Sequence, residues 1–258
     1  KDYFESNTTD NNPKRLAILV DQFKQLTIEG NGADLIMHDR IQPFTIDQSA
    51  NITIQNLQVD WDIPLTAQAK VVEVTAQYID LQINMTESPY ILEKGKLVFV
   101  GEGWKSGWWG TMEFDATTRL IAQGTGDDGC MGNNWENYIA TELSPGLVRL
   151  NYAFTRKPKK GSMLVLRHNE RDHAGVFITE SHDITLKNLK IFHTAGLGIL
   201  SQYSSNLSML HVLVGPNKAK GRFLSGHDDG LHFSNCKGKI VVEDCEFEGL
   251  MDDPINVH

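Results

Sequence analysis

Hydrophobic and polar residues alternate along several short segments of the chain. The clearest examples are residues 25–30, 51–57, 183–189, 206–210 and 239–245. A period of two residues is typical of a β-strand with one buried face. No stretch keeps apolar residues at helical spacing over three turns. The pattern therefore predicts an all-β protein.

Some alternating segments recur at similar intervals, and two of them begin with Asn/Asp-x-Thr, at residues 51–53 and 183–185. From Thr27 to Thr53 the step is 26 residues, and from Thr185 to Ser208 it is 23. Steps of this length are expected when one coil of a parallel solenoid is stacked on the next. We therefore predict a right-handed parallel β-helix, with coils in residues 1–63 and again in residues 164–258.

The repeat lapses between residues 64 and 163, where alternating segments are joined by short turns. This indicates an inserted antiparallel β-barrel or sandwich. The insert contains the run Gly103–Gly110, which holds Trp104, Trp108 and Trp109. These tryptophans can stack on a sugar or form the core of the insert, and Trp61 leaves the same two alternatives open.

A six-residue unit with a central Gly or Pro followed by an apolar residue occurs four times, at residues 173–178, 194–199, 228–233 and 252–257. The last two copies begin with Asp-Asp and lie 24 residues apart. The unit is therefore structural, and the carboxylates are additions to it. The alignment predicts one inward ladder made of Val176, Leu197, Leu231 and Ile255.

Stacking of the last two copies would bring four carboxylates together, because neighbouring strands lie about 4.8 Å apart. Asp228 is expected near Asp252, and Asp229 near Asp253. Like charges in a partly enclosed site raise at least one pKa, so an acid and a base can coexist there.

Strict alternation would turn Asp229 and Asp253 inward, unless the chain bends at the Gly or Pro that follows each pair. The same alternation predicts an outer, substrate-facing set of Asp228, His232, Asp252 and Asn256.

Two other interpretations of the acidic pairs stay open. Asp-Asp-Gly and Asp-Asp-Pro are also common turn sequences on a solvated surface. A Ca²⁺ site would use several carboxylate oxygens as well. The neighbouring His227, His232 and His258 favour a functional site, with His258 a further candidate for substrate contact.

Composition narrows the class of ligand. The formal net charge of −9 makes nucleic acid an unsuitable partner. No apolar run reaches the roughly 20 residues of a membrane span. The three cysteines favour free thiols, although a Cys236–Cys245 disulfide stays open. The ends at Lys1 and His258 suggest processing boundaries of a longer protein.

Three motifs carry a resemblance to a known family: Gly226–His232, Glu243–Gly249 and Met251–His258. Together they resemble glycoside hydrolase family 110, the α-1,3-galactosidases of gut bacteria such as Bacteroides, and the similarity extends over most of the chain. It implies exo-acting, inverting removal of terminal α-1,3-linked galactose, as in blood group B antigens and linear α-galactosyl glycans. It further implies catalysis by Asp229, Asp252 and Asp253, no metal or organic cofactor, and export to the periplasm or cell surface of a Gram-negative bacterium. A homodimer stays open.

Inversion requires an acid and a base about 6.5–9.5 Å apart, which is farther than residues on adjacent coils. We therefore expect Asp252 or Asp253 to be the base and Asp229 to hold a galactose hydroxyl or complete the base site. The acid is expected beyond residue 258. Sugar contacts are expected from Asp228, His232, Asn256, His258, Trp104 and Trp108. The competing hypotheses are a Ca²⁺-dependent β-helix polysaccharide lyase and a non-catalytic glycan-binding β-helix.

Overall fold

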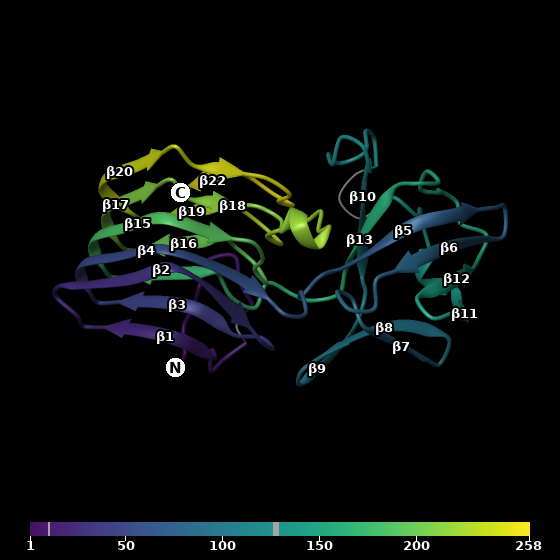
Figure 1. The fold of residues 1–258 in the computed structure, drawn as a ribbon, viewed down its shortest axis with the longest axis horizontal. Helices are drawn as coiled ribbons and strands as arrows, with labels where there is room; N and C mark the ends of the chain where they lie inside the picture. Colours follow the sequence, from purple (N-terminus) through teal and green to yellow (C-terminus); the bar gives the residue numbers. More distant parts are fainter. Residues whose placement is uncertain (10, 126–128) are drawn as a thin grey trace. The chain divides into compact units, whose positions relative to one another are not determined.

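The computed structural model describes residues 1–9, 11–125 and 129–258, which form two compact units (Figure 1). Unit 1 comprises residues 1–62 and 170–258, and unit 2 comprises residues 63–169. Helix in the described residues is limited to two short 3-10 turns, η1 (Trp135–Asn137) and η2 (Lys218–Lys220). None of the described helices has the length and apolar character of a membrane span.

Unit 1 contains two parallel sheets, and the chain passes from one to the other. The first sheet has the order β1 (Leu16–Asp21), β3 (Gln42–Asp47), β14 (Val176–Thr179), β16 (Ile199–Gln202), β19 (Leu231–Ser234) and β22 (Ile255–Val257). The second has the order β2 (Leu26–Met37), β4 (Ala50–Trp61), β15 (His182–Ile191), β17 (Ser205–Leu210) and β20 (Lys237–Glu243). Two short strands, β18 (Leu213–Val214) and β21 (Glu246–Phe247), extend the second sheet beside β15.

Apolar side chains on neighbouring strands of the second sheet are stacked in register. Ile52 pairs with Ile184, which pairs with Leu207, and all three side chains are fully buried. Each of these ladder residues follows a polar residue in left-handed backbone, at Asn51, Asp183 and Asn206 with φ of 55° in all three cases. Asn and Asp tolerate this conformation better than other side chains, which explains the repeated Asn/Asp-x-Thr beginning.

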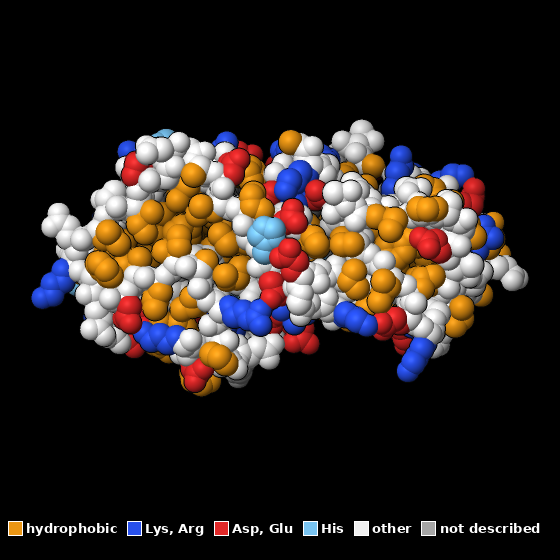
Figure 2. Space-filling view, turned by 60° about the horizontal axis from the view of Figure 1, so that its bottom comes forward, with side chains coloured by type: hydrophobic (Ala, Val, Ile, Leu, Met, Phe, Trp, Pro, Cys, Tyr) orange, Lys and Arg blue, Asp and Glu red, His pale blue; other side chains and the backbone are white. Residues whose placement is uncertain are grey.

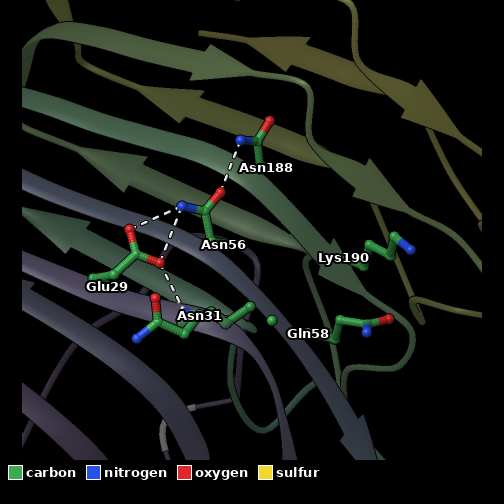
Figure 3. Close-up of a pocket in the computed structure, with 8 residues that line it drawn as sticks. Glu29, Asn31, Asn56, Gln58, Asn188 and Lys190 are labelled. Carbon is green, nitrogen blue, oxygen red and sulfur yellow. Dashed lines mark hydrogen bonds between the residues drawn. The ribbon is translucent and has the colours of Figure 1, made fainter.

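Polar side chains form a second ladder on the second sheet (Figure 3). Glu29 accepts hydrogen bonds from Asn56 Nδ2 and from the Asn31 backbone N–H, and Asn188 Nδ2 donates to Asn56 Oδ1 at 2.8 Å. The backbone N–H of Asn31 and the Gln55 and Asn56 amides keep the pKa of Glu29 below its ordinary value. The side chains of Glu29, Asn56 and Asn188 therefore bond to one another and link strands β2, β4 and β15.

The repeated unit of the first sheet shows one error in the predicted register. Val176 pairs with Ile199, Ile199 with Leu231, and Leu231 with Ile255. Ile199 thus takes the place expected for Leu197, because the run Gly196-Leu197-Gly198-Ile199 contains the Gly-apolar unit twice. Glycine is required at position 198, directly before Ile199 of the ladder, since a Cβ there would lie 2.5 Å from the Gly230 carbonyl oxygen.

The outer strands of unit 1 leave apolar side chains open to solvent. Leu19 on β1 is 40% exposed, and Ile36 on β2 is 43% exposed. Figure 2 brings this side of unit 1 forward and shows apolar side chains gathered there. Apolar side chains are therefore open to solvent at β1 and β2, the end strands of the two parallel sheets.

Unit 2 is built from antiparallel strands. Its larger sheet has the order β10 (Gly110–Phe114), β13 (Met163–Arg167), β5 (Ala67–Val74), β6 (Tyr78–Ile83), β12 (Leu147–Asn151) and β11 (Ile139–Ser144). A second sheet has the order β7 (Tyr90–Glu93), β8 (Lys96–Gly101) and β9 (Trp104–Gly107). Alternate residues of β5 and β6 are buried, including Val71 and Leu81, so the sheets enclose the core of this unit.

The predicted right-handed parallel β-helix with an inserted barrel is wrong as a fold class. The protein is all-β, but its strands lie in separate parallel and antiparallel sheets, none of which closes on itself in the described residues. Alternation and repeat length indicate which segments form strands and lie beside one another. They do not determine how sheets join or whether they close, because those features depend on the long-range path of the chain.

Candidate active site

Both Asp-Asp pairs lie in bends directly before strands β19 and β22. The backbone N–H of Gly230 donates to the Asp253 carbonyl at 3.0 Å, and that of Gly198 donates to the Asp229 carbonyl at 2.8 Å. Asp229 and Asp253 thus occupy equivalent positions on neighbouring strands. The prediction that Asp229 lies beside Asp253 is confirmed. Asp229 is buried, as strict alternation predicts, whereas Asp253 is exposed.

Three carboxylates meet at these bends. Oxygen atoms of Asp229, Asp252 and Asp253 all lie within 4.8 Å of one another. The Asp253 backbone N–H connects the other two, since it lies 3.2 Å from Asp229 Oδ1 and 3.1 Å from Asp252 Oδ1. Asp229 is only 1% exposed, whereas Asp252 and Asp253 are exposed. One buried carboxylate therefore lies behind two that face solvent.

The charges of the cluster act on Asp252. Partial burial raises its pKa above the ordinary value, and the neighbouring carboxylates of Asp229 and Asp253 raise it further. A carboxylate with a raised pKa is a stronger base when ionised and a more persistent acid when protonated. The same three oxygen atoms are also close enough to hold a hard cation such as Ca²⁺. The cluster can therefore serve acid–base chemistry or cation binding.

His232 lies behind the cluster instead of on the outer face expected from alternation. Its side chain has no exposed area, and its Nδ1 lies 2.7 Å from Asp229 Oδ2. The Nε2 atom lies 3.3 Å from Ser6 Oγ, and the ring lies 4.9 Å from that of His258. His232 is thus placed to orient Asp229.

Asp228 forms an ion pair with the side chain of Arg171. Its carboxylate is buried, and Oδ1 lies 2.8 Å from Arg171 Nε, whose side chain is 41% exposed. The Nδ1 atom of His227 lies 3.6 Å from Asp228 Oδ2. The neighbouring Asp172 accepts hydrogen bonds from the N-terminal segment, at Thr9 and Asn11.

The two remaining candidates of the last repeated unit lie on strand β22 and at its end. Asn256 pairs with His232 across strands β22 and β19 and is half-buried. His258 is exposed. Asn256 therefore lies one strand from the residue that contacts Asp229.

The tryptophans of the 103–110 run divide into two buried residues and one exposed residue. Trp108 Nε1 donates to the Tyr138 hydroxyl at 2.6 Å, and Trp104 stacks on His168 with ring centroids 5.2 Å apart. Both indoles are less than 10% exposed and pack inside unit 2. Trp109 is 43% exposed, with the Arg167 guanidinium 4.3 Å from its ring. The packing favours the core alternative for Trp104 and Trp108 and leaves Trp109 as the indole open to solvent.

Trp61 also belongs to a core, that of unit 1. It is fully buried, its Nε1 donates to the Asp39 carbonyl at 3.0 Å, and its ring lies between those of His173 and His193. Burial lowers the pKa of His173 to about 4 and that of His193 to about 3, so both are neutral near pH 7. The neighbouring Asp60 pairs with Arg222 in the same buried region.

The N-terminal segment crosses the first sheet and carries a buried acid. Tyr3 donates its hydroxyl to Asp47 Oδ2 at 2.7 Å, and Lys14 Nζ donates to the Asp172 carbonyl. Glu5, between them in sequence, is 5% exposed, and burial raises its pKa from 4.5 to about 7. The segment is therefore anchored on both sides of a carboxyl group that the fold holds protonated in mild acid.

We predict that Glu5→Gln removes a pH-dependent loss of stability. The folded state favours protonated Glu5, so the stabilisation is complete below pH 4.5 and is lost as the pH rises to about 7. Relative to the wild type, the variant should gain about 2–3 kcal/mol in free energy of unfolding between pH 4.5 and 7.5. Urea unfolding at both pH values measures this. Glu29→Gln is the control and should show no such gain, because Glu29 is exposed and its pKa is lowered.

Comparison with known proteins identifies the relatives of this chain. Residues 67–164 match the family described as GLAA-B beta-barrel domain I. The whole chain is 53% identical to alpha-1,3-galactosidase B of Bacteroides thetaiotaomicron, and it covers 42% of that protein. It is 34% identical to alpha-1,3-galactosidase A of Bacteroides fragilis and 32% identical to that of Shewanella woodyi, again over the full chain and 42% of each relative. The chain belongs to the family of bacterial α-1,3-galactosidases.

Membership in the α-1,3-galactosidase family confirms the resemblance expected from the sequence motifs. The chain spans less than half the length of these curated relatives, at 42%. The region that matches the barrel-domain family corresponds to most of unit 2, where strands β5 to β13 lie. The acidic cluster lies in unit 1, outside that matched region.

Two residues from other parts of the chain reach the acidic bends. Ser6 reaches His232 from 226 positions away, and Arg171 reaches Asp228 from 57 positions away. Arg171 had a weak signal, since it lies two residues before the first repeated unit. Ser6 had none, because nothing in an irregular N-terminal segment indicates which strand it crosses.

Proposed function

We propose that the full-length protein is an exo-acting, inverting α-1,3-galactosidase and that this chain supplies its general base. The observation that carries the proposal is the cluster of Asp229, Asp252 and Asp253, with one buried and two solvent-facing carboxylates within 4.8 Å. Similarity to relatives that are named alpha-1,3-galactosidases supports the same reaction.

The division of roles follows from exposure. A water molecule that attacks the anomeric carbon must contact the base, so the base is Asp252 or Asp253. Asp229 is buried and holds the geometry of the cluster or a galactose hydroxyl. The separation of these carboxylates is below the roughly 6.5–9.5 Å that inverting enzymes need between acid and base. The acid that protonates the leaving oxygen is therefore a group outside the cluster.

The substrate we propose is a glycan that ends in α-1,3-linked galactose, either branched as in blood group B antigens or linear. Sugar contacts by Asp228, Asn256 and His258 are part of this proposal. So is export to the periplasm or cell surface of a Gram-negative bacterium, where such glycans are met. Fractionation of cells would test the location, and sedimentation of the full-length protein would test a homodimer.

We expect the full-length protein to release free galactose from an α-1,3-galactosyl disaccharide. Because the reaction inverts, proton NMR of the early product should show β-galactose before mutarotation. A Ca²⁺-dependent lyase would instead lose activity in chelator and form an unsaturated product that absorbs in the ultraviolet. Binding of the glycan without any release of sugar would contradict the proposal and favour a binding module.

A further inference from the structure

His232 connects the acidic cluster to the N-terminal segment through two side-chain contacts. On one side its Nδ1 lies 2.7 Å from Asp229 Oδ2, and on the other its Nε2 lies 3.3 Å from Ser6 Oγ. The side chains of Asp229 and His232 are at most 2% exposed. Such a buried chain of polar groups has a defined direction, because each donor must face an acceptor.

The contacts of His232 fit its neutral Nδ1–H tautomer. A carboxylate only accepts hydrogen bonds, so in this tautomer the Nδ1 proton faces Asp229. The lone pair on Nε2 then faces the Ser6 hydroxyl, which can donate to it. If Ser6 did not donate to Nε2, the proton of His232 could move to Nε2. The lone pair on Nδ1 would then face the Asp229 carboxylate, which is unfavourable because neither group can donate.

Ser6 is itself held in place by strand β16. Its backbone N–H donates to Gln202 Oε1 at 3.1 Å, while Gln202 Nε2 donates to the Phe4 carbonyl at 2.9 Å. Gln202 thus binds the backbone on both sides of Glu5. The hydroxyl of Ser6 is therefore presented to His232 by a segment bound at several points.

Asp229 is held at both carboxylate oxygen atoms. Oδ2 faces His232, and Oδ1 accepts the backbone N–H of Asp253 at 3.2 Å. The same N–H lies 3.1 Å from Asp252 Oδ1. Rotation of the Asp229 carboxylate would release the Asp253 amide and change the spacing of the two exposed acids.

We propose that His232 is a positioning residue that orients Asp229 and thereby the exposed carboxylates of Asp252 and Asp253, with Ser6 setting its tautomer. The inference rests on the proposed galactosidase function. His232 touches no sugar in this role, which replaces the substrate contact expected from the sequence. A purely structural His–Asp pair would stabilise the fold without affecting turnover specifically.

The test compares two substitutions of His232 in the full-length protein. Asn places an amide N–H near the position of Nδ1, whereas Leu has nearly the volume of imidazole and no donor. Hydrogen bonds to charged groups predict that His232→Leu lowers kcat by about 10- to 100-fold, with KM changed less than about threefold. His232→Asn should recover most of this loss. The substrate is the α-1,3-galactosyl disaccharide, and thermal unfolding is measured alongside.

Double variants distinguish a positioning role of His232 from a general loss of folded structure. In an Asp229→Asn background, His232→Leu should lower kcat by less than about threefold further, because its effect passes through Asp229. Ser6→Ala should lower kcat by about 3- to 10-fold in the wild type and have little effect beside His232→Asn. Should His232→Leu be unable to fold, the two Ser6→Ala measurements alone decide the question.

A matched control is available on the second sheet. His182 lies 2.8 Å from Asp183 through the same Nδ1–carboxylate contact, but its side chain is 56% exposed. His182→Leu should leave kcat and KM unchanged. Three results would each overturn the inference. They are equal losses of kcat for His232→Asn and His232→Leu, fully additive effects of His232→Leu and Asp229→Asn on kcat, and an unchanged kcat in Ser6→Ala. An inactive wild type would instead contradict the proposed function.

Discussion

Replacement of Asp252 or Asp253 by asparagine is expected to lower kcat of the full-length protein by about 10²–10⁴-fold, for whichever residue is the base. Asparagine keeps nearly the same volume but cannot accept the proton of the attacking water. Because the side chain keeps its volume, the fold should tolerate the change. Galactose binding should survive, because the loss concerns the transition state. Steady-state kinetics on the α-1,3-galactosyl disaccharide measure kcat and KM together.

The control for this experiment is Asp244→Asn, which changes an exposed aspartate at the end of strand β20. Its kinetics should equal those of the wild type. Asp229→Asn should raise KM as well as lower kcat if Asp229 holds a galactose hydroxyl. Near-normal turnover in both the Asp252 and Asp253 variants, without dependence on Ca²⁺, would leave the acidic pairs as turn residues.

Arg222→Met is expected to lower the free energy of unfolding by about 3–5 kcal/mol. The guanidinium binds Asp60 through Nη1 and donates to the Trp61 carbonyl through Nη2 at 2.9 Å, and both charged side chains are at least 95% buried. Burial opposes ionisation of Asp60, but Arg222 and the Asn217 hydrogen bond still keep its pKa below the ordinary value. Among the described residues, removal of Arg222 would leave that buried carboxylate with Lys220 and Asn217 as side-chain partners.

Urea unfolding of the variant and the wild type measures this loss. Lys218→Met removes an exposed ion pair with Glu248 from the same turn and should cost at most about 1 kcal/mol. Combining Arg222→Met with Asp60→Asn should cost less than the sum of the two single changes, since it removes both buried charges. A loss below about 1 kcal/mol for Arg222→Met would show that solvent reaches Asp60 after all.

Parts of the site could be predicted because they depend on local repeats. The spacing of 24 residues between the Asp pairs placed Asp229 beside Asp253, and the Gly and Pro after them indicated the bends. The same reasoning failed at Leu197, where a doubled Gly-apolar unit offered two registers two residues apart. Only the neighbouring strands choose between these registers, because the Gly198 backbone must fit against Gly230.

Other parts depended on contacts that leave no local pattern. Alternation assigned His232 to the outer face, but the structure buries it behind Asp229, where the N-terminal segment covers it. The indoles of Trp104 and Trp108 satisfied both a sugar-binding and a core interpretation, and their partners His168 and Tyr138 lie 64 and 30 residues away. Aromatic composition cannot decide between these uses, because both need the same large flat side chain.

By itself the sequence determined the all-β class, the antiparallel character of the middle segment, the placement of Asp229 beside Asp253 and the family. Each of these depends on residues close together in sequence or on motifs of a few residues. The tertiary structure alone decided that the strands form separate open sheets, that Ile199 replaces Leu197 in the ladder, and that Ser6 and Arg171 reach the acidic bends. These features depend on where distant segments pack, and packing is set by the whole chain at once instead of by local periodicity.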